Sequence, residues 1–205
     1  MERTISGLAL STILVLLPVA AQAELSAPER LMQEVYAEGG ETLYCQREFG
    51  PDSNARADYI YPERRMRDHF DCRVRRLCLR DERYVSAVND LHNLYFVRRS
   101  VEIERRGTRF GELPGDPDED CGYRAAFQTF EPPDHAKGPV ARSMLYMHVR
   151  HELPIIGSSS MMLRWAREFP PTEEERMRNE RIEAAQGNRN PFIDDPGRLD
   201  ELILE

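Results

Sequence analysis

Apolar residues recur at helical spacing mainly in the second half of the chain. They predict a helix over residues 139–153 and a second over residues 161–169, which the serines at 158–160 can cap. A capping-box pattern at Thr172 predicts a third helix that continues to about Ala185 and stops at Gly187. The methionines and aromatic residues of these helices are expected to form the core.

The first half of the chain combines helical and strand-like patterns of apolar residues. A capping box at Ser26 opens a helix that Gly39 ends, and charged helices are predicted at residues 81–88 and 98–106. Residues 58–61 alternate and are aromatic, and residues 90–97 are also typical of a strand. The predicted fold class is therefore α+β, mainly helical, with a small β-hairpin in the N-terminal half.

The first 23 residues have the pattern of a signal peptide. Arg3 supplies a basic start, residues 7–20 are an apolar run too short to span a bilayer comfortably, and Ala21-Gln22-Ala23 is a small-residue cleavage site. We expect a single domain over residues 24–205, periplasmic or secreted, with no membrane attachment once the signal is removed.

Four cysteines, at positions 45, 72, 78 and 121, follow this segment. In an oxidising compartment they predict two disulfides, with three possible pairings. Cys72 and Cys78 with His69 nearby are the alternative, a zinc site, which an oxidising compartment disfavours.

Charge is unevenly distributed along the chain. The formal net charge is −8, which gives no global attraction to nucleic acid, yet residues 64–109 carry 13 arginines against 7 acidic residues. Lys137 is the only lysine. Phosphate binding and a bias in genome composition explain this arginine content equally well.

Several motifs together resemble one family. They are TLYC at 42–45, DLHNL at 90–94, KGPVAR at 137–142 followed by Tyr146-Met147, and Trp165 followed by RNERIEAAQGNRNPFIDDP. The set, which extends over nearly all of residues 24–205, resembles the bacterial endonuclease I family of exported His-Me finger nucleases. The resemblance implies a ββα-metal-like core and hydrolysis of DNA or RNA phosphodiesters assisted by Mg²⁺ or Ca²⁺.

The resemblance also assigns site positions. Asp58 matches the metal-binding carboxylate, Tyr59 the general-base histidine, Arg75 the phosphate-binding arginine and Gly107 the metal-binding asparagine. Around Gly107, Arg105 and Phe110-Gly111 also fit the family pattern. Additional nucleic-acid contacts are expected from Arg73, Arg76 and Arg105.

Two of these positions depart from the family pattern. A tyrosine has an ordinary pKa of about 10, so at neutral pH it cannot accept a proton from water, and Gly107 has no side chain to offer a metal. Glu104 is a substitute carboxylate to consider, and His69 a relocated base. The simpler interpretation of each is a solvated side chain, as it is for His135. His92 is expected to be structural and His151 an ordinary helix residue, while Asp90 and Asn93 are minor candidates for a displaced metal site.

The sequence is compatible with three alternative functions. The sequence favours a family member that keeps the fold and an arginine-lined nucleic-acid surface but has lost, or nearly lost, hydrolysis. The second is an active nuclease with a rebuilt site, using Asp58 with Glu104 and an unidentified base. The third is an envelope protein that uses the fold as a scaffold for a protein partner. The preference for DNA or RNA and the oligomeric state do not follow from the sequence.

Overall fold

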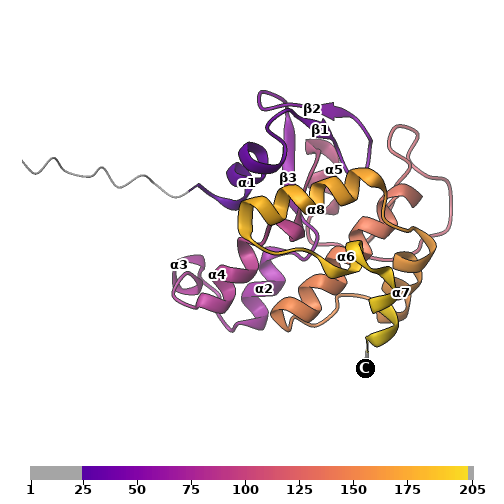
Figure 1. Ribbon diagram of the computed structural model, residues 1–205. Helices are drawn as coiled ribbons and strands as arrows, with labels where there is room; N and C mark the ends of the chain where they lie inside the picture. The colour runs from indigo at the N-terminus through magenta and orange to yellow at the C-terminus, as the bar shows by residue number, and fades with distance from the viewer. Residues whose placement is uncertain (1–24, 203–205) are drawn as a thin grey trace, which may run out of the picture.

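The computed structural model describes residues 25–202, so the predicted signal peptide lies outside the described residues (Figure 1). The helices are α1 (Ala27–Arg30), η1 (Leu31–Val35), α2 (Glu63–His69), α3 (Arg75–Cys78), α4 (Glu82–Val88), η2 (Leu91–Asn93), α5 (Arg99–Arg105), α6 (Asp134–His151), α7 (Ser159–Glu168), α8 (Glu173–Gln186), α9 (Pro191–Asp194) and η3 (Pro196–Glu201). The strands are β1 (Gly40–Glu41), β2 (Glu48–Phe49), β3 (Ala55–Tyr59), β4 (Leu94–Arg98), β5 (Arg109–Phe110), β6 (Arg124–Ala126) and β7 (Thr129–Glu131). Among these helices, none has the length and apolar character needed to cross a membrane. The α+β, mainly helical class is confirmed.

The central hairpin pairs β3 with β4 in antiparallel register, from Ala55 opposite Arg98 to Tyr59 opposite Leu94. The chain between the two strands forms α2, α3 and α4, which Figure 1 shows grouped at one edge of the molecule. α5 follows β4 directly and packs against both strands. The two remaining small sheets are β1–β2 and a mixed sheet in which β7 lies between β5 and β6.

Three predicted boundaries were wrong. The first strand, predicted over residues 58–61, occupies Ala55–Tyr59. The second strand was predicted over residues 90–97, but it begins at Leu94 because the Asp90 side chain accepts a hydrogen bond from the His92 amide and turns residues 91–93 into a 3₁₀ helix. The helix predicted from Pro139 begins five residues earlier, at Asp134. Pro139 therefore lies inside the helix, where the N–H that it lacks removes one helical hydrogen bond.

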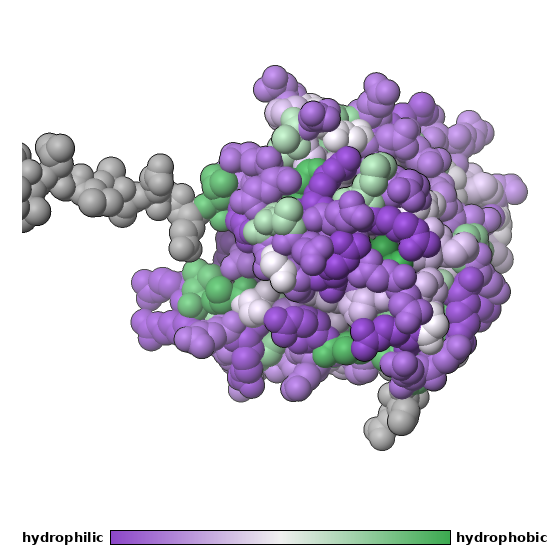
Figure 2. Space-filling view, in the orientation of Figure 1, coloured by the Kyte–Doolittle hydropathy of each residue, from purple (hydrophilic) through white to green (hydrophobic). Residues whose placement is uncertain are grey.

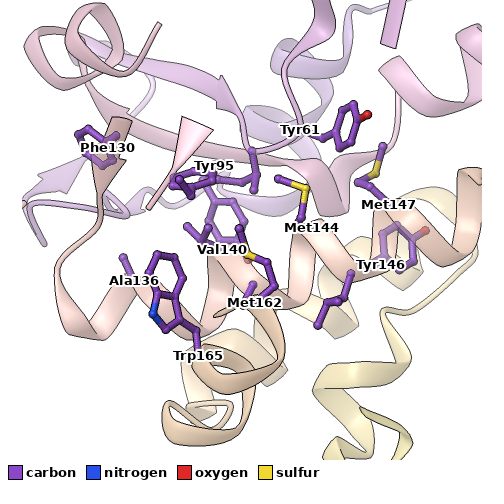
Figure 3. Close-up of a cluster of buried hydrophobic side chains, with 14 of the residues drawn as sticks. Tyr61, Tyr95, Phe130, Ala136, Val140, Met144, Tyr146, Met147, Met162 and Trp165 are labelled. Carbon is purple, nitrogen blue, oxygen red and sulfur yellow. The ribbon is translucent and has the colours of Figure 1, made fainter. Parts of the chain in front are cut away.

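α6 is the central helix of the larger core. Its residues from Ala136 to Met147 are nearly all buried, and Met144, Met147 and Tyr146 lie among side chains from the hairpin and from α7 (Figure 3). Gly138 allows α7 to come close, because a Cβ there would lie 2.2 Å from the carbonyl oxygen of Phe169. The prediction that methionines and aromatic residues form the core is confirmed.

Buried polar residues tie α8 to the rest of the fold. Arg142 of α6 donates to the Glu175 carboxylate at 2.8 Å and to the Phe169 carbonyl at 2.7 Å. Arg178 donates to the carbonyls of Leu91 and Leu94 at 2.8 and 2.6 Å. These bonds connect the C-terminal helices to the start of β4.

Both predicted disulfides form, and the structure decides their pairing. Cys45 bonds Cys121 across a separation of 76 residues, and Cys72 bonds Cys78 across six. Because Cys72 and Cys78 are bonded to each other, they offer no thiolate pair for zinc.

Candidate active site

Asp58 lies at the end of β3 and is buried. Its Oδ1 accepts a 2.7 Å hydrogen bond from Arg105, and its Oδ2 accepts from Arg105 and, at 3.4 Å, from the Tyr44 hydroxyl. Burial raises the pKa of Asp58, while the charge and hydrogen bonds of Arg105 oppose that rise. The structure thus brings Asp58 and Arg105 together, 47 residues apart in sequence, but in a buried ion pair with both carboxylate oxygens occupied.

Tyr59 is half-buried beside Glu63 and Arg75. Burial and the Glu63 carboxylate raise the pKa of Tyr59 to about 12, although Arg75 acts in the opposite direction. The nearby arginines therefore do not prepare the phenol as a base. At neutral pH the group at the general-base position stays protonated.

Gly107 follows α5 on the surface. Its φ of +79° is a left-handed conformation, and a Cβ built there would have no atom within 4 Å. Asparagine is among the side chains that tolerate this conformation best. The backbone geometry and the space would therefore accept the residue that the family pattern has here.

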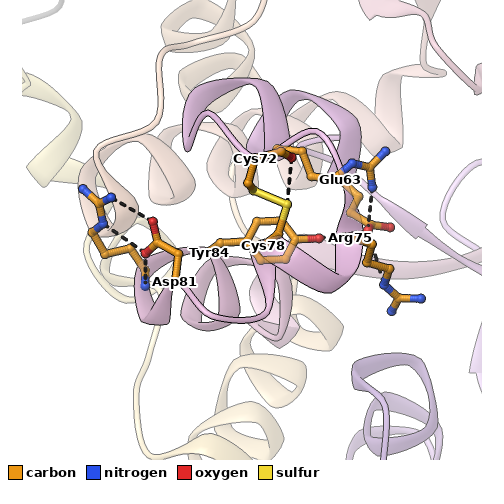
Figure 4. The surroundings of a disulfide bond; sticks show 8 residues. Glu63, Cys72, Arg75, Cys78, Asp81 and Tyr84 are labelled. Atoms are coloured by element: carbon orange, nitrogen blue, oxygen red, sulfur yellow. Dashed lines mark hydrogen bonds and ion pairs between the residues drawn. A yellow bond between two sulfur atoms is a disulfide. The ribbon is translucent and has the colours of Figure 1, made fainter.

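Glu63 is the residue that sequence reasoning missed. Its Oε1 accepts hydrogen bonds from Arg67 at 2.7 Å and from the Tyr84 hydroxyl at 2.9 Å, and it lies 3.7 Å from Nε of Arg75 (Figure 4). The spacing of Glu63 and Arg67 indicates a helical ion pair, but the contact with Arg75 depends on how α2, α3 and α4 pack. Glu63 places a partly exposed carboxylate between the general-base and phosphate positions.

The other arginines assigned to nucleic acid divide into two groups. Arg73 and Arg76 are exposed beside the Cys72–Cys78 disulfide and make no ion pair within residues 25–202, and the side chain of Arg75 is 71% exposed. These three can reach a phosphate. Arg105 is 3% exposed and committed to Asp58, so it cannot reach one without breaking that pair.

A second basic region lies at the other end of the hairpin, where Ala55 pairs with Arg98. Arg47, Arg98 and Arg99 line an open cavity of about 550 Å³ there. The sequence placed Arg98 and Arg99 in the basic segment but gave no sign that Arg47 joins them.

The remaining candidates do not gather at the hairpin end. His69 and His135 are exposed, and the exposed Glu104 adds to the rise that burial causes in the pKa of Tyr123, the residue before β6. Asp90 is buried and accepts from Tyr146 at 2.7 Å and His151 at 2.9 Å, within a network that ties α6 to the hairpin. His92 and Asn93 are buried in the same region, where Asn93 accepts from the Tyr61 amide at 2.6 Å.

The family's metal does not fit the residues present. Both oxygens of Asp58 accept hydrogen bonds from Arg105, Gly107 has no side-chain donor atom, and a divalent cation prefers several oxygen ligands. Within residues 25–202, no group of three or more His, Cys, Asp or Glu side chains is placed to hold a metal ion.

Comparison with known proteins places this geometry in context. A profile of the family described as Endonuclease I matches residues 58–197, more than half of the chain. The matched region begins at Asp58 and includes Tyr59, Arg75 and Gly107.

Relatives with curated names include nucleases of both substrate types. An extracellular ribonuclease of Bacillus subtilis (strain 168) is 35% identical over 124 residues, covering 51% of this chain and 41% of the relative. An extracellular deoxyribonuclease of Aeromonas hydrophila is 30% identical over 126 residues, covering 58% of this chain and 55% of the relative. A periplasmic deoxyribonuclease of the same organism is 31% identical over 126 residues, covering 58% of this chain and 53% of the relative. The chain thus matches only about half of the length of these relatives.

Proposed function

The chain belongs to the endonuclease I family, and from that membership we propose that it is an exported nucleic-acid-binding protein in which metal-dependent hydrolysis is lost or severely impaired. The observation that carries the proposal is the state of Tyr59. Burial and Glu63 raise its pKa to about 12, the opposite of the change that a general base requires.

The departures from the family pattern at Tyr59 and Gly107 act together. Arg105 fits the family pattern, so its pairing with Asp58 does not by itself distinguish this chain from an active member. What distinguishes it is that the neighbouring base position holds a protonated phenol and the second ligand position holds no side chain. The general-base and metal contributions to phosphodiester hydrolysis are both weakened.

Phosphate binding does not depend on those two positions. Arg73, Arg75 and Arg76 are exposed on and beside α3, and a planar guanidinium suits a phosphate. Relatives carry names of both ribonucleases and deoxyribonucleases. We therefore expect affinity for nucleic acid of either kind, falling steeply as salt rises.

An active nuclease with a rebuilt site is the second candidate, and Glu63 is the observation that favours it. This carboxylate stands next to Tyr59 and 3.7 Å from Arg75, the position where a base would meet a bound phosphodiester. Its hydrogen bonds from Arg67 and Tyr84 oppose that role, because they occupy one carboxylate oxygen.

The test measures cleavage and binding on the same preparations. Supercoiled plasmid and structured RNA are incubated with the oxidised protein in Mg²⁺, in Ca²⁺ and in EDTA, beside the variants Tyr59→His/Gly107→Asn and Glu63→Gln. We expect no metal-dependent cleavage by wild type and a gain of cleavage by the double variant. Cleavage by wild type that is abolished by Glu63→Gln or Asp58→Ala would establish a rebuilt site instead.

Binding separates the proposal from a scaffold for a protein partner. Affinity for a short DNA or RNA is measured between 50 and 200 mM salt, for wild type, Arg75→Ala and the control Arg150→Ala, whose arginine is exposed on α6. Arg75→Ala should weaken binding and lower the logarithmic salt slope by about one, while the control changes neither. No salt-dependent affinity in wild type would contradict nucleic-acid binding.

A further inference from the structure

An apolar cluster interrupts the arginine-rich surface around α3. Val74, Leu77 and Leu79 are 56%, 49% and 54% exposed, and they lie within six residues of one another. Figure 2 shows an apolar patch among polar side chains at the edge where Figure 1 places α3. Clustered exposed aliphatic side chains on a soluble protein commonly mark an interaction surface.

A disulfide lies in the same segment of the chain. Cys78 is the buried residue of α3, and its bond to Cys72 closes a loop of six residues with a Cα–Cα distance of 5.1 Å. Leu77 and Leu79, on either side of buried Cys78, are exposed. The disulfide thus constrains the short segment that carries the cluster.

Positive charge is concentrated in the sequence around the cluster. Residues 64–80 carry seven arginines against two aspartates, Asp68 and Asp71, a formal charge of +5 in a chain of net charge −8. Within residues 25–202, five of these arginines are exposed and make no ion pair: Arg64, Arg65, Arg73, Arg76 and Arg80. We name these five arginines, together with Val74, Leu77 and Leu79, the α3 patch.

We propose that the α3 patch docks on an anionic lipid surface, with its aliphatic side chains entering the headgroup boundary and its arginines contacting acidic headgroups. Elements that lie at membrane interfaces combine these two side-chain types, and each arginine near an anionic surface strengthens binding about fivefold. The proposal does not rest on the function proposed above, although the patch shares Arg73 and Arg76 with the surface proposed there for nucleic-acid phosphate.

The chemistry of the patch disfavours other occupants. A second copy of the chain would bring two sets of arginines against each other. The patch itself has no aromatic side chain, so it offers no stacking platform to unpaired bases. The cavity lined by Arg47, Arg98 and Arg99 and a neighbouring one beside η1 both lie away from the patch.

The experiment is vesicle flotation of the oxidised full chain, with vesicles of phosphatidylglycerol and phosphatidylcholine in equal parts and with phosphatidylcholine alone, at 50 and 150 mM salt. The variant is Val74→Ser/Leu77→Ser/Leu79→Ser. Its matched control is Ile103→Ser/Val149→Ser/Met177→Ser, which removes three exposed apolar side chains elsewhere.

Wild type should partition at least tenfold more strongly to the anionic vesicles, and the α3 variant should lose at least tenfold of that affinity while the control keeps it. The thermal unfolding midpoint of the α3 variant should match wild type, because the three side chains are exposed. Equal binding to both vesicle types, or no binding to either, overturns the proposal. If wild type does not bind vesicles and the α3 variant loses affinity for nucleic acid, the patch binds nucleic acid instead.

Discussion

The C-terminal helices and the hairpin with α5 carry the family pattern in different ways. In the helices, several residues of the matching motifs are buried and hydrogen-bonded: Arg142 with Glu175, Arg178 with two backbone carbonyls, and Asn190 with Asn179. At the hairpin, Asp58 and Arg105 match and are buried, whereas Tyr59 and Gly107 differ and are half-buried or exposed.

This difference follows from what each position does for folding. Replacing a buried, hydrogen-bonded arginine leaves polar groups unpartnered in the core, which costs several kcal/mol. Replacing an exposed residue after α5 costs little. We therefore expect that the chemistry at the hairpin can change while buried residues such as Arg142 and Arg178, which support the fold, are retained.

The largest effect is expected from the Arg142–Glu175 pair. Arg142→Met leaves Glu175 buried without its partner, so we expect the free energy of unfolding to fall by about 3 to 5 kcal/mol. Urea unfolding measures this. The control, Arg167→Met, removes an arginine whose partner Asp200 is exposed, and it should cost less than about 1 kcal/mol. Similar losses in both variants would remove the contrast between buried and exposed family positions.

The two disulfides should contribute unequally. Loop-closure entropy predicts that Cys45→Ser/Cys121→Ser lowers the free energy of unfolding by about 4 kcal/mol, because the bond closes 76 residues. Cys72→Ser/Cys78→Ser, which opens a loop of six, should cost about 2 kcal/mol. Denaturant unfolding of both variants provides the comparison. A larger loss of unfolding free energy in Cys72→Ser/Cys78→Ser would mean that the Cys72–Cys78 bond stabilises more of the fold than the segment of the α3 patch.

His92 should make stability depend on pH. Burial lowers its pKa to about 4, despite the opposing charge of Asp90 and with a contribution from Arg178. The unfolded chain takes up the proton near pH 6.5 and the folded chain only near pH 4, so stability is complete above pH 6.5 and falls by about 3 kcal/mol as pH drops to 4. His92→Gln should flatten this part of the stability profile, and His69→Gln, at an exposed position, should not. Profiles with the same slope in wild type and His92→Gln would exclude this origin.

Local signals in the sequence were sufficient for much of the fold. The cap at Thr172 and the stop at Gly187 act within a few residues, and α8 begins and ends beside them. The start of β4 was not predictable in the same way, because the Asp90 cap competes with the strand pattern.

The site depends on contacts between distant segments. Asp58 meets Arg105 across 47 residues, and Glu63 meets Tyr84 across 21. The residue types at positions 58, 59 and 107 are read directly from the sequence, and they are the reason to expect impaired hydrolysis. The rise in the pKa of Tyr59 and the presence of Glu63 required the packing of α2, α3 and α4. The same limit applies to the disulfides, whose number followed from the cysteine count and whose pairing did not.

The smallest effect is expected at the general-base position itself. The Tyr59 hydroxyl makes no hydrogen bond to another group within residues 25–202 and stays protonated at neutral pH. Tyr59→Phe should therefore change the free energy of unfolding by less than about 0.5 kcal/mol. It should also leave nucleic-acid affinity and any residual cleavage unchanged, whereas Arg75→Ala weakens binding in the same assays. Loss of cleavage on Tyr59→Phe would show that the phenol takes part in catalysis. The hairpin would then retain the catalytic function of the family with a different residue at position 59.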